Sequence, residues 1–137
     1  WVGDVEEADG KMLATLIEQG IVPVMAPLTH DKEGHILNTN ADTIASEVAC
    51  ALAPYFDVTL TFCFEKPGVL ANPDDDDSVI AHINSQTYPQ LKAEGIVSGG
   101  MIPKLDNAFS AISRGVKSVV ITHFQNIDGK KGTKISL

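Results

Sequence analysis

One lysine of the sequence lies at a helix position where a basic side chain is unfavourable. Lys104 follows Gly99, Gly100 and Pro103 and falls in the first turn of a predicted helix. That turn presents unpaired backbone N–H groups and the positive end of the helix dipole. Adjacent glycines let backbone N–H groups approach an anion closely, and proline is compatible with a first turn. A bound phosphate would explain the arrangement; the alternative is a solvated lysine after a flexible loop.

Three polar clusters contain the other side chains that could do chemistry. They span residues 38–42, 65–70 and 96–104. We expect all three at the carboxyl ends of strands in a parallel sheet, where loops lead into helices and where ligands bind. Asp42 could instead cap a helix, and Asn38 and Asn40 could be turn formers. We assign Asn40 to the turn formers.

Metal chemistry is not indicated. Calcium loops require alternating ligands and a defined glycine turn, whereas Asp74 to Asp77 are consecutive and typical of a solvated loop. The four histidines lie far apart in the sequence without ligand spacing, so we expect surface or packing roles for them. The sequence contains no Walker A motif, G-x-G-x-x-G motif or G-x-S-x-G motif.

The elements that must position these clusters alternate between helices and strands. Apolar periodicity predicts helices within 8–20, at 42–53, near 85–94 and from about 101 onward. Strands are predicted at 21–26, 57–64, 118–124 and 133–137. The first of these should be buried and the second should be central in the sheet. We also expect a short edge strand near the amino terminus and a polar hairpin over 29–36. This order predicts an α/β fold, a three-layer αβα sandwich with a mainly parallel sheet covered on both faces.

The composition is that of one globular domain spanning residues 1–137. With 44% hydrophobic and 20% charged residues, the chain can bury a substantial core. Its formal net charge of -8 opposes nonspecific binding to nucleic acid or to an anionic membrane, so a polyanionic ligand needs local positive groups. No stretch approaches the ~20 apolar residues of a membrane span. Cys50 and Cys63 lie in apolar patterns, so we expect two buried free thiols in a cytoplasmic protein.

Three motifs, in this order and at these separations, resemble one known family. They are NTNAD at 38–42, KPGVL at 66–70 and GIVSGGMIPK at 95–104. Together they resemble the carboxyl-terminal half of acetylglutamate kinase, within the amino acid kinase superfamily. The third motif is the most specific, and the likeness covers nearly the whole chain. The first residues, WVGDVEE, are typical of the middle of a fold. We therefore expect a fragment of a longer protein, without the amino-terminal part that binds the acylglutamate.

The resemblance implies the nucleotide-binding half of an amino acid kinase-like fold. The implied reaction transfers the γ-phosphoryl group of ATP, with Mg²⁺ held mainly by the nucleotide, to the side-chain carboxylate of an N-acylglutamate in arginine biosynthesis. Lys104 matches the family lysine that stabilises the transferring phosphoryl group, Asp42 the aspartate that organises the catalytic lysines, and Asn38 the asparagine that holds the acylglutamate. The two nucleotide-contacting segments correspond to Glu65, Lys66, Pro67, Gly68, Val69 and Leu70, and to Ile96, Val97 and Ser98. The full-length protein is expected to form a homo-oligomer.

The chemistry of the residues agrees with those roles. An acceptor carboxylate is already ionised at neutral pH, so phosphoryl transfer to it needs alignment and positive charge rather than a protein base.

The chain departs from the family pattern at three positions. The family usually has a small hydroxyl residue followed by an aspartate where this chain has Phe64 and Glu65, and an apolar residue where it has Lys66. These departures affect the adenine and ribose contacts. Two alternatives stay open: a related phosphotransferase acting on aspartate, carbamate or a nucleotide, and a noncatalytic nucleotide-binding module.

Overall fold

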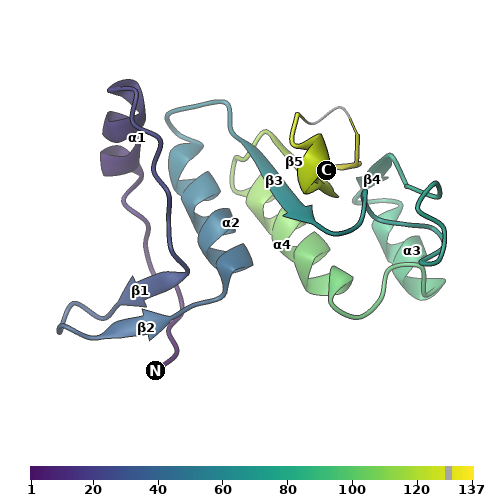
Figure 1. Cartoon of the computed structure of the whole chain (residues 1–137), viewed down its shortest axis with the longest axis horizontal. Coiled ribbons are helices and arrows are strands. Elements are labelled where there is room, and N and C mark those ends of the chain that lie inside the picture. Colours follow the sequence, from purple (N-terminus) through teal and green to yellow (C-terminus); the bar gives the residue numbers. More distant parts are fainter. Residues whose placement is uncertain (129–130) are drawn as a thin grey trace.

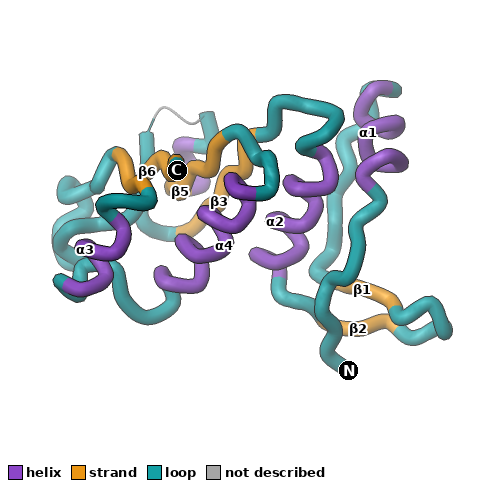
Figure 2. Tube along the Cα trace, turned by 180° about the vertical axis from the view of Figure 1, so that it is seen from behind, coloured by secondary structure: helices purple, strands orange, loops and turns teal. Residues whose placement is uncertain are grey.

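The computed structural model describes residues 1–128 and 131–137 and contains alternating helices and short strands (Figure 1). In chain order the elements are α1 (Gly10–Glu18), β1 (Leu28–His30), β2 (Ile36–Asn38), α2 (Ala41–Leu52), β3 (Thr59–Phe64), β4 (His82–Asn84), α3 (Tyr88–Ala93), α4 (Met101–Ser113), β5 (Ser118–His123), a 3-10 turn (Phe124–Asn126) and β6 (Thr133–Ser136). Helix α1 and the β1–β2 hairpin lie at one end of the molecule and α3 at the other (Figure 2).

The main sheet has four strands in the order β3-β5-β6-β4. The β3–β5 and β4–β6 pairs are parallel, and the β5–β6 pair is antiparallel. Strands β1 and β2 form a separate antiparallel hairpin at the turn expected over 29–36. The α/β class and the mainly parallel sheet are therefore confirmed.

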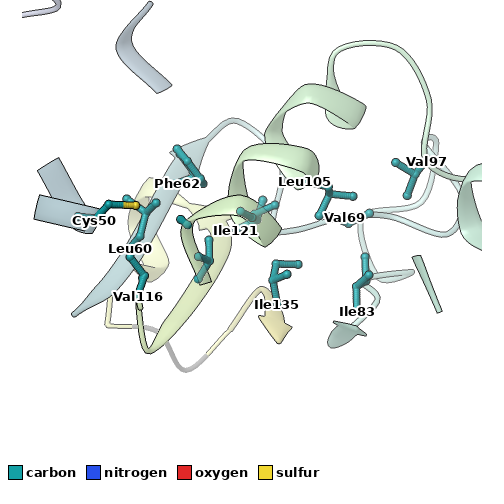
Figure 3. Packing of buried hydrophobic residues seen from close by; sticks show 14 residues of the cluster. Cys50, Leu60, Phe62, Val69, Ile83, Val97, Leu105, Val116, Ile121 and Ile135 are labelled. Atoms are coloured by element: carbon teal, nitrogen blue, oxygen red, sulfur yellow. The ribbon is translucent and has the colours of Figure 1, made fainter. Parts of the chain in front are cut away.

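One face of this sheet forms the core with helices α2 and α4 (Figure 3). Alternate residues of a strand share a face, so the register places Leu60 beside Val119, Phe62 beside Ile121 and Ile135 beside Ile83. These side chains pack against residues of the two helices, among which Leu105 of α4 is fully buried. The core thus fixes α4, and with it the turn that contains Lys104.

The opposite face of the sheet is partly open among the described residues. Thr59, Cys63, His82 and Lys134 point to that side by their register, and all four are exposed. Cys50 is buried as expected, but the prediction of a buried thiol at Cys63 is wrong. Strand alternation explains the error, because an apolar run in a strand does not by itself show that both faces are covered.

The apolar segment 21–26 is not a strand in the described structure, which corrects the prediction of a buried one. Ile21, Val22, Val24 and Met25 are 51%, 83%, 93% and 52% exposed. A strand needs a partner for its backbone, and no strand of the part of the chain that the structure describes pairs with this segment. The segment therefore runs without secondary structure from α1 to the β1–β2 hairpin.

Two further expectations about strand position are corrected. Strand β3, predicted to be central, lies at one edge of the sheet as described, since β5 is its one neighbour there. The amino-terminal edge strand is reduced to one isolated bridge between Val2 and Asn38. The short strand β4 was not predicted, because His82–Asn84 is too short to show a periodic pattern.

The helices begin and end where local chemistry places them. Asp9 caps α1 by accepting the N–H of Met12 at 2.8 Å, and Gly20, with φ +78°, follows its last turn. Gly10 packs so closely on α2 that a Cβ there would lie 2.1 Å from the carbonyl oxygen of Ala51. Within the described residues, no helix is both long and apolar enough to span a bilayer.

Candidate active site

The amino ends of α2 and α4 lie on the side of the molecule toward which β3 points (Figure 1). Helix α2 is capped by Asn40, whose side-chain oxygen accepts the N–H of Thr43 at 3.1 Å. This leaves Asp42 in the first turn, where the helix dipole favours a carboxylate. Helix α4 begins after Gly100 without a side-chain cap. Its first turn therefore retains positive partial charge, to which Lys104 adds a full positive charge.

Lys104 and Asp42 form an ion pair between these two first turns. The Nζ atom of Lys104 donates to Oδ2 of Asp42 at 2.5 Å, and the side chains are 28% and 33% exposed. The pair joins residues 62 positions apart in the sequence. Because Asn40 is the cap of α2, the carboxylate of Asp42 is available to hold the lysine. Solvent still reaches both groups, so a ligand can approach the ammonium.

Phe62 of the sheet is a second neighbour of the Lys104 ammonium. Its ring centre lies 5.6 Å from Nζ of Lys104, within the range of a cation–π contact. The residue is 6% exposed and belongs to the core. Sequence reasoning did not identify Phe62 as part of the site. The available signal was strand alternation, since every second residue of β3 faces the two helices.

The loop that leads into α4 has open space around its two glycines. Gly99 has φ +54°, and a Cβ added to Gly99 or Gly100 would meet no atom within 4 Å. Val97 anchors the loop, because its side chain is buried and its N–H donates to the carbonyl of Leu91 at 3.1 Å. Ile96 is half-buried and Ser98 is exposed. A ligand at this segment would therefore meet backbone groups and the Ser98 hydroxyl rather than bulky side chains.

The segment after β3 begins with two exposed charged residues. Glu65 and Lys66 are both exposed, and Pro67 is half-buried. The Nζ atom of Lys66 donates to Oδ1 of Asp76 at 2.9 Å, and this hydrogen bond raises the pKa of Lys66 above its ordinary value. The aspartate run that we assigned to a solvated loop thus supplies a partner for a residue of the candidate nucleotide segment.

The rest of that segment is built into the sheet. Gly68, Val69 and Leu70 are buried. The N–H of Val69 donates to Oγ1 of Thr133 at 2.8 Å, and a Cβ on Gly68 would lie 2.9 Å from the same oxygen. Glycine is therefore required by close packing at this position. Among these six residues, the exposed Glu65 and Lys66 are the ones whose side chains can reach a ligand freely.

Asn38 ends strand β2, two residues before the cap of α2. Its backbone N–H donates to the carbonyl of Trp1 and its carbonyl accepts from Gly3, both at 3.0 Å. The residue is exposed, whereas the neighbouring Thr39 is buried and donates from its hydroxyl to the carbonyl of Gly3 at 3.0 Å. The backbone around Asn38 is thus fixed while its side chain remains accessible near the start of α2.

An exposed cluster at the hairpin turn contains Asp31, Glu33 and His35, whose candidate ligand atoms lie within 4.8 Å of one another. Nδ1 of His35 lies 2.6 Å from Oδ2 of Asp31, and this hydrogen bond lowers the pKa of Asp31. The ring of His35 also stacks on Trp1 with 5.0 Å between ring centres. These contacts account for the cluster as part of the hairpin's own structure.

Comparison with known proteins assigns the chain to a family. Residues 1–123 match the model of the amino acid kinase family, and the chain belongs to this family. Among its relatives are the acetylglutamate kinases of Parabacteroides distasonis, 58% identical over 98% of this chain, and of Methanopyrus kandleri, 38% identical over 97% of it. The chain spans about half the length of these relatives, 53% in both cases.

Solved structures have the same architecture. The protein smu.665 of Streptococcus mutans aligns with a TM-score of 0.79 and 32% identity, over 99% of this chain and 51% of its own. The N-acetylglutamate synthase of Neisseria gonorrhoeae aligns with a TM-score of 0.79 over 99% of this chain and 32% of its own, but at 20% identity it shows the fold alone.

Proposed function

We propose that this chain is the nucleotide-side half of an acetylglutamate kinase. In this proposal, a longer polypeptide transfers the γ-phosphoryl group of ATP to the side-chain carboxylate of N-acetylglutamate and releases ADP and an acyl phosphate. The observation that supports it best is the ion pair of Lys104 with Asp42 at the two helix starts, in a chain 58% identical to an acetylglutamate kinase. A noncatalytic binding module would have no need of this pair.

Lys104 has the central role in the proposed mechanism. Catalysis of phosphoryl transfer consists mainly of alignment and of neutralising the charge on the equatorial oxygens of the migrating group. A compact ammonium beside the positive end of α4 supplies that charge. Asp42 holds the ammonium in place and acts as no base, because the acceptor carboxylate is already ionised. The exposed Asn38 side chain is assigned to the acylglutamate.

We assign the nucleotide to the segments 65–70 and 96–98 and to the glycines that precede α4. Around Gly99 and Gly100 no side chain fills the space before α4, which fits the close approach of phosphate oxygens to backbone N–H groups. Ser98 and the exposed Glu65 and Lys66 are available for the rest of the nucleotide. ATP supplies the phosphoryl group, and Mg²⁺ bound mainly to its phosphates offsets their charge. We assign the reaction to arginine biosynthesis in the cytoplasm, and we propose a homo-oligomer for the longer protein.

The first test is nucleotide binding by the 137-residue chain. We expect weak, magnesium-dependent binding of ADP and ATP without measurable turnover, because both nucleotide segments are present and other parts of the relatives' length are not. Calorimetry with MgADP, with and without excess EDTA, measures this. Rapid phosphorylation of acetylglutamate by the chain alone would show that the site is complete within these residues, contrary to the proposal.

The second test concerns the acceptor. ADP release by the longer polypeptide should be fastest with N-acetylglutamate or another N-acylglutamate and slow with aspartate or carbamate. Parallel assays with these acceptors at equal concentration discriminate between members of the class. Activity with aspartate or carbamate alone would contradict the acylglutamate assignment, although the phosphotransferase class would remain.

A further inference from the structure

We propose that Phe62 is a positioning residue that holds the ammonium of Lys104 for phosphoryl transfer. The inference rests on the proposed function of Lys104. The ring centre of Phe62 lies 5.6 Å from Nζ of Lys104, and Asp42 contacts the same atom at 2.5 Å. The lysine head group is thus held by a carboxylate from α2 and by an aromatic ring from β3.

The ring of Phe62 is held rigidly, whereas the side chain of Lys104 is flexible. Phe62 is 6% exposed, and its backbone is paired with Ile121 of β5 in the middle of their parallel ladder. Lys104 has four rotatable side-chain bonds and loses conformational entropy when it is fixed. Asp42 restrains the end of that side chain at one point. A second contact from a fixed ring narrows the remaining positions of the ammonium.

An aromatic ring has an advantage over a second carboxylate in this position. A second carboxylate would take another N–H of Lys104 and add a negative charge that repels a phosphoryl group. The face of a ring attracts the ammonium through its quadrupole, without a formal charge. The 28% of the Lys104 side chain that is exposed therefore stays available to an incoming anion. An aliphatic residue at position 62 would fill the core but would not attract the ammonium.

Nuclear magnetic resonance of the 137-residue chain tests the contact directly. The ring current of Phe62 should shift the Hε resonances of Lys104 upfield, and these resonances are assigned by their loss in Lys104→Met. We expect the shift to disappear in Phe62→Leu and to persist in Phe109→Leu, which removes a ring that stacks on Tyr88 instead. Lys104 resonances that are the same in the wild type and in Phe62→Leu would overturn the inference.

A second measurement separates the attraction of the ring from its volume. Pentafluorophenylalanine at position 62 has nearly the shape of phenylalanine but a reversed quadrupole. Because Lys104 is assigned to the γ-phosphoryl group, we expect this variant to bind Mg-AMP-PNP about two- to tenfold more weakly, with MgADP binding unchanged. Equal losses for the two nucleotides, or none, would contradict a positioning role for the ring.

The two measurements also separate this inference from the proposed function. If the wild type binds neither nucleotide, the proposed nucleotide site is wrong, and the Lys104 resonances still decide whether Phe62 holds the ammonium. If both nucleotides bind normally while Phe62→Leu leaves the Lys104 resonances unchanged, the proposed function stands and the role of Phe62 is refuted. Circular dichroism of each variant confirms that it folds.

Discussion

Lys104 lies at a position that does not favour the stability of its own helix. A basic residue in a first turn opposes the helix dipole, and the pairing with Asp42 offsets that conflict only in part. Phe62 and Asp42 reach the ammonium from different elements, and part of the Lys104 side chain remains exposed to solvent. This is the arrangement expected of a group that must meet a charge that develops during a reaction.

In the longer polypeptide of the proposed function, Lys104→Met should lower kcat by about 100- to 1000-fold with a much smaller change in KM for acylglutamate. The interaction is made mainly with the migrating phosphoryl group, so its loss appears in kcat. Lys104→Arg should also be impaired, because a planar guanidinium does not replace a compact ammonium. Steady-state kinetics measure both variants. Lys11→Met, which changes an exposed lysine of α1, is the control. A normal kcat in Lys104→Met would make Lys104 an ordinary surface residue.

Among the elements, α2 and α4 must hold a fixed relation for the Lys104–Asp42 pair to exist. Small residues allow their close packing, and Arg114, at the end of α4, donates to both carboxylate oxygens of Glu47 in α2 at 2.6 and 2.7 Å. The hydrogen bonds from Arg114 lower the pKa of Glu47, against the smaller effect of burial. The ion pair thus joins the carboxyl end of α4 to the middle of α2, away from the two first turns.

Replacing Glu47 by glutamine should lower the free energy of unfolding by about 0.5–1 kcal/mol at pH 7, the usual range for a partly exposed pair. Since the folded-state pKa of Glu47 is depressed, this stabilisation is complete above its ordinary value of 4.5 and is lost as the pH falls through the folded pKa. Urea unfolding of the wild type and Glu47→Gln at pH 7 and pH 3 measures it. The difference should be smaller at pH 3 than at pH 7. Glu18→Gln, at an exposed carboxylate, is the control, and a difference as large at pH 3 as at pH 7 would exclude the ion pair as its cause.

The sequence predicted the elements better than their arrangement. Helix boundaries follow local signals such as the Asn40 cap and Gly20, and the β-branched and aromatic run at 57–64 contains β3. The edge position of β3 depends on long-range pairing that no local pattern records. The roles of Lys104 and Asp42 came from motif resemblance. Phe62 could not be assigned in advance, because its place in the site depends on how β3 sits beneath α4.

At the scale of the whole molecule, the main feature is the uncovered apolar run from Ile21 to Met25. Folded domains seldom leave such a contiguous patch in water without a binding surface for it. We expect the 137-residue chain to self-associate with increasing concentration, and Val24→Lys to reduce this association. Val24 is 93% exposed, so the change should cost little folding free energy.

Light scattering over a concentration series measures the association, and thermal unfolding measures any cost in stability. Ile127→Lys is the matched control, because Ile127 is also exposed, at 70%, but lies outside the run. Equal effects of the two lysine substitutions would indicate a general effect of charge and would contradict a specific role for the apolar run.

The unequal exposure of the two cysteines makes the molecule selectively labelable. Cys63 is exposed on the open face of β3, directly after Phe62 in the chain but on the opposite side of the strand. Cys50 is buried, and burial raises the pKa of its thiol, so little reactive thiolate is present near neutral pH. A maleimide fluorophore should therefore attach to Cys63 alone in the folded chain and to both thiols after denaturation, as mass spectrometry would show. A dye at that position could report nucleotide binding without replacing any residue assigned to the site.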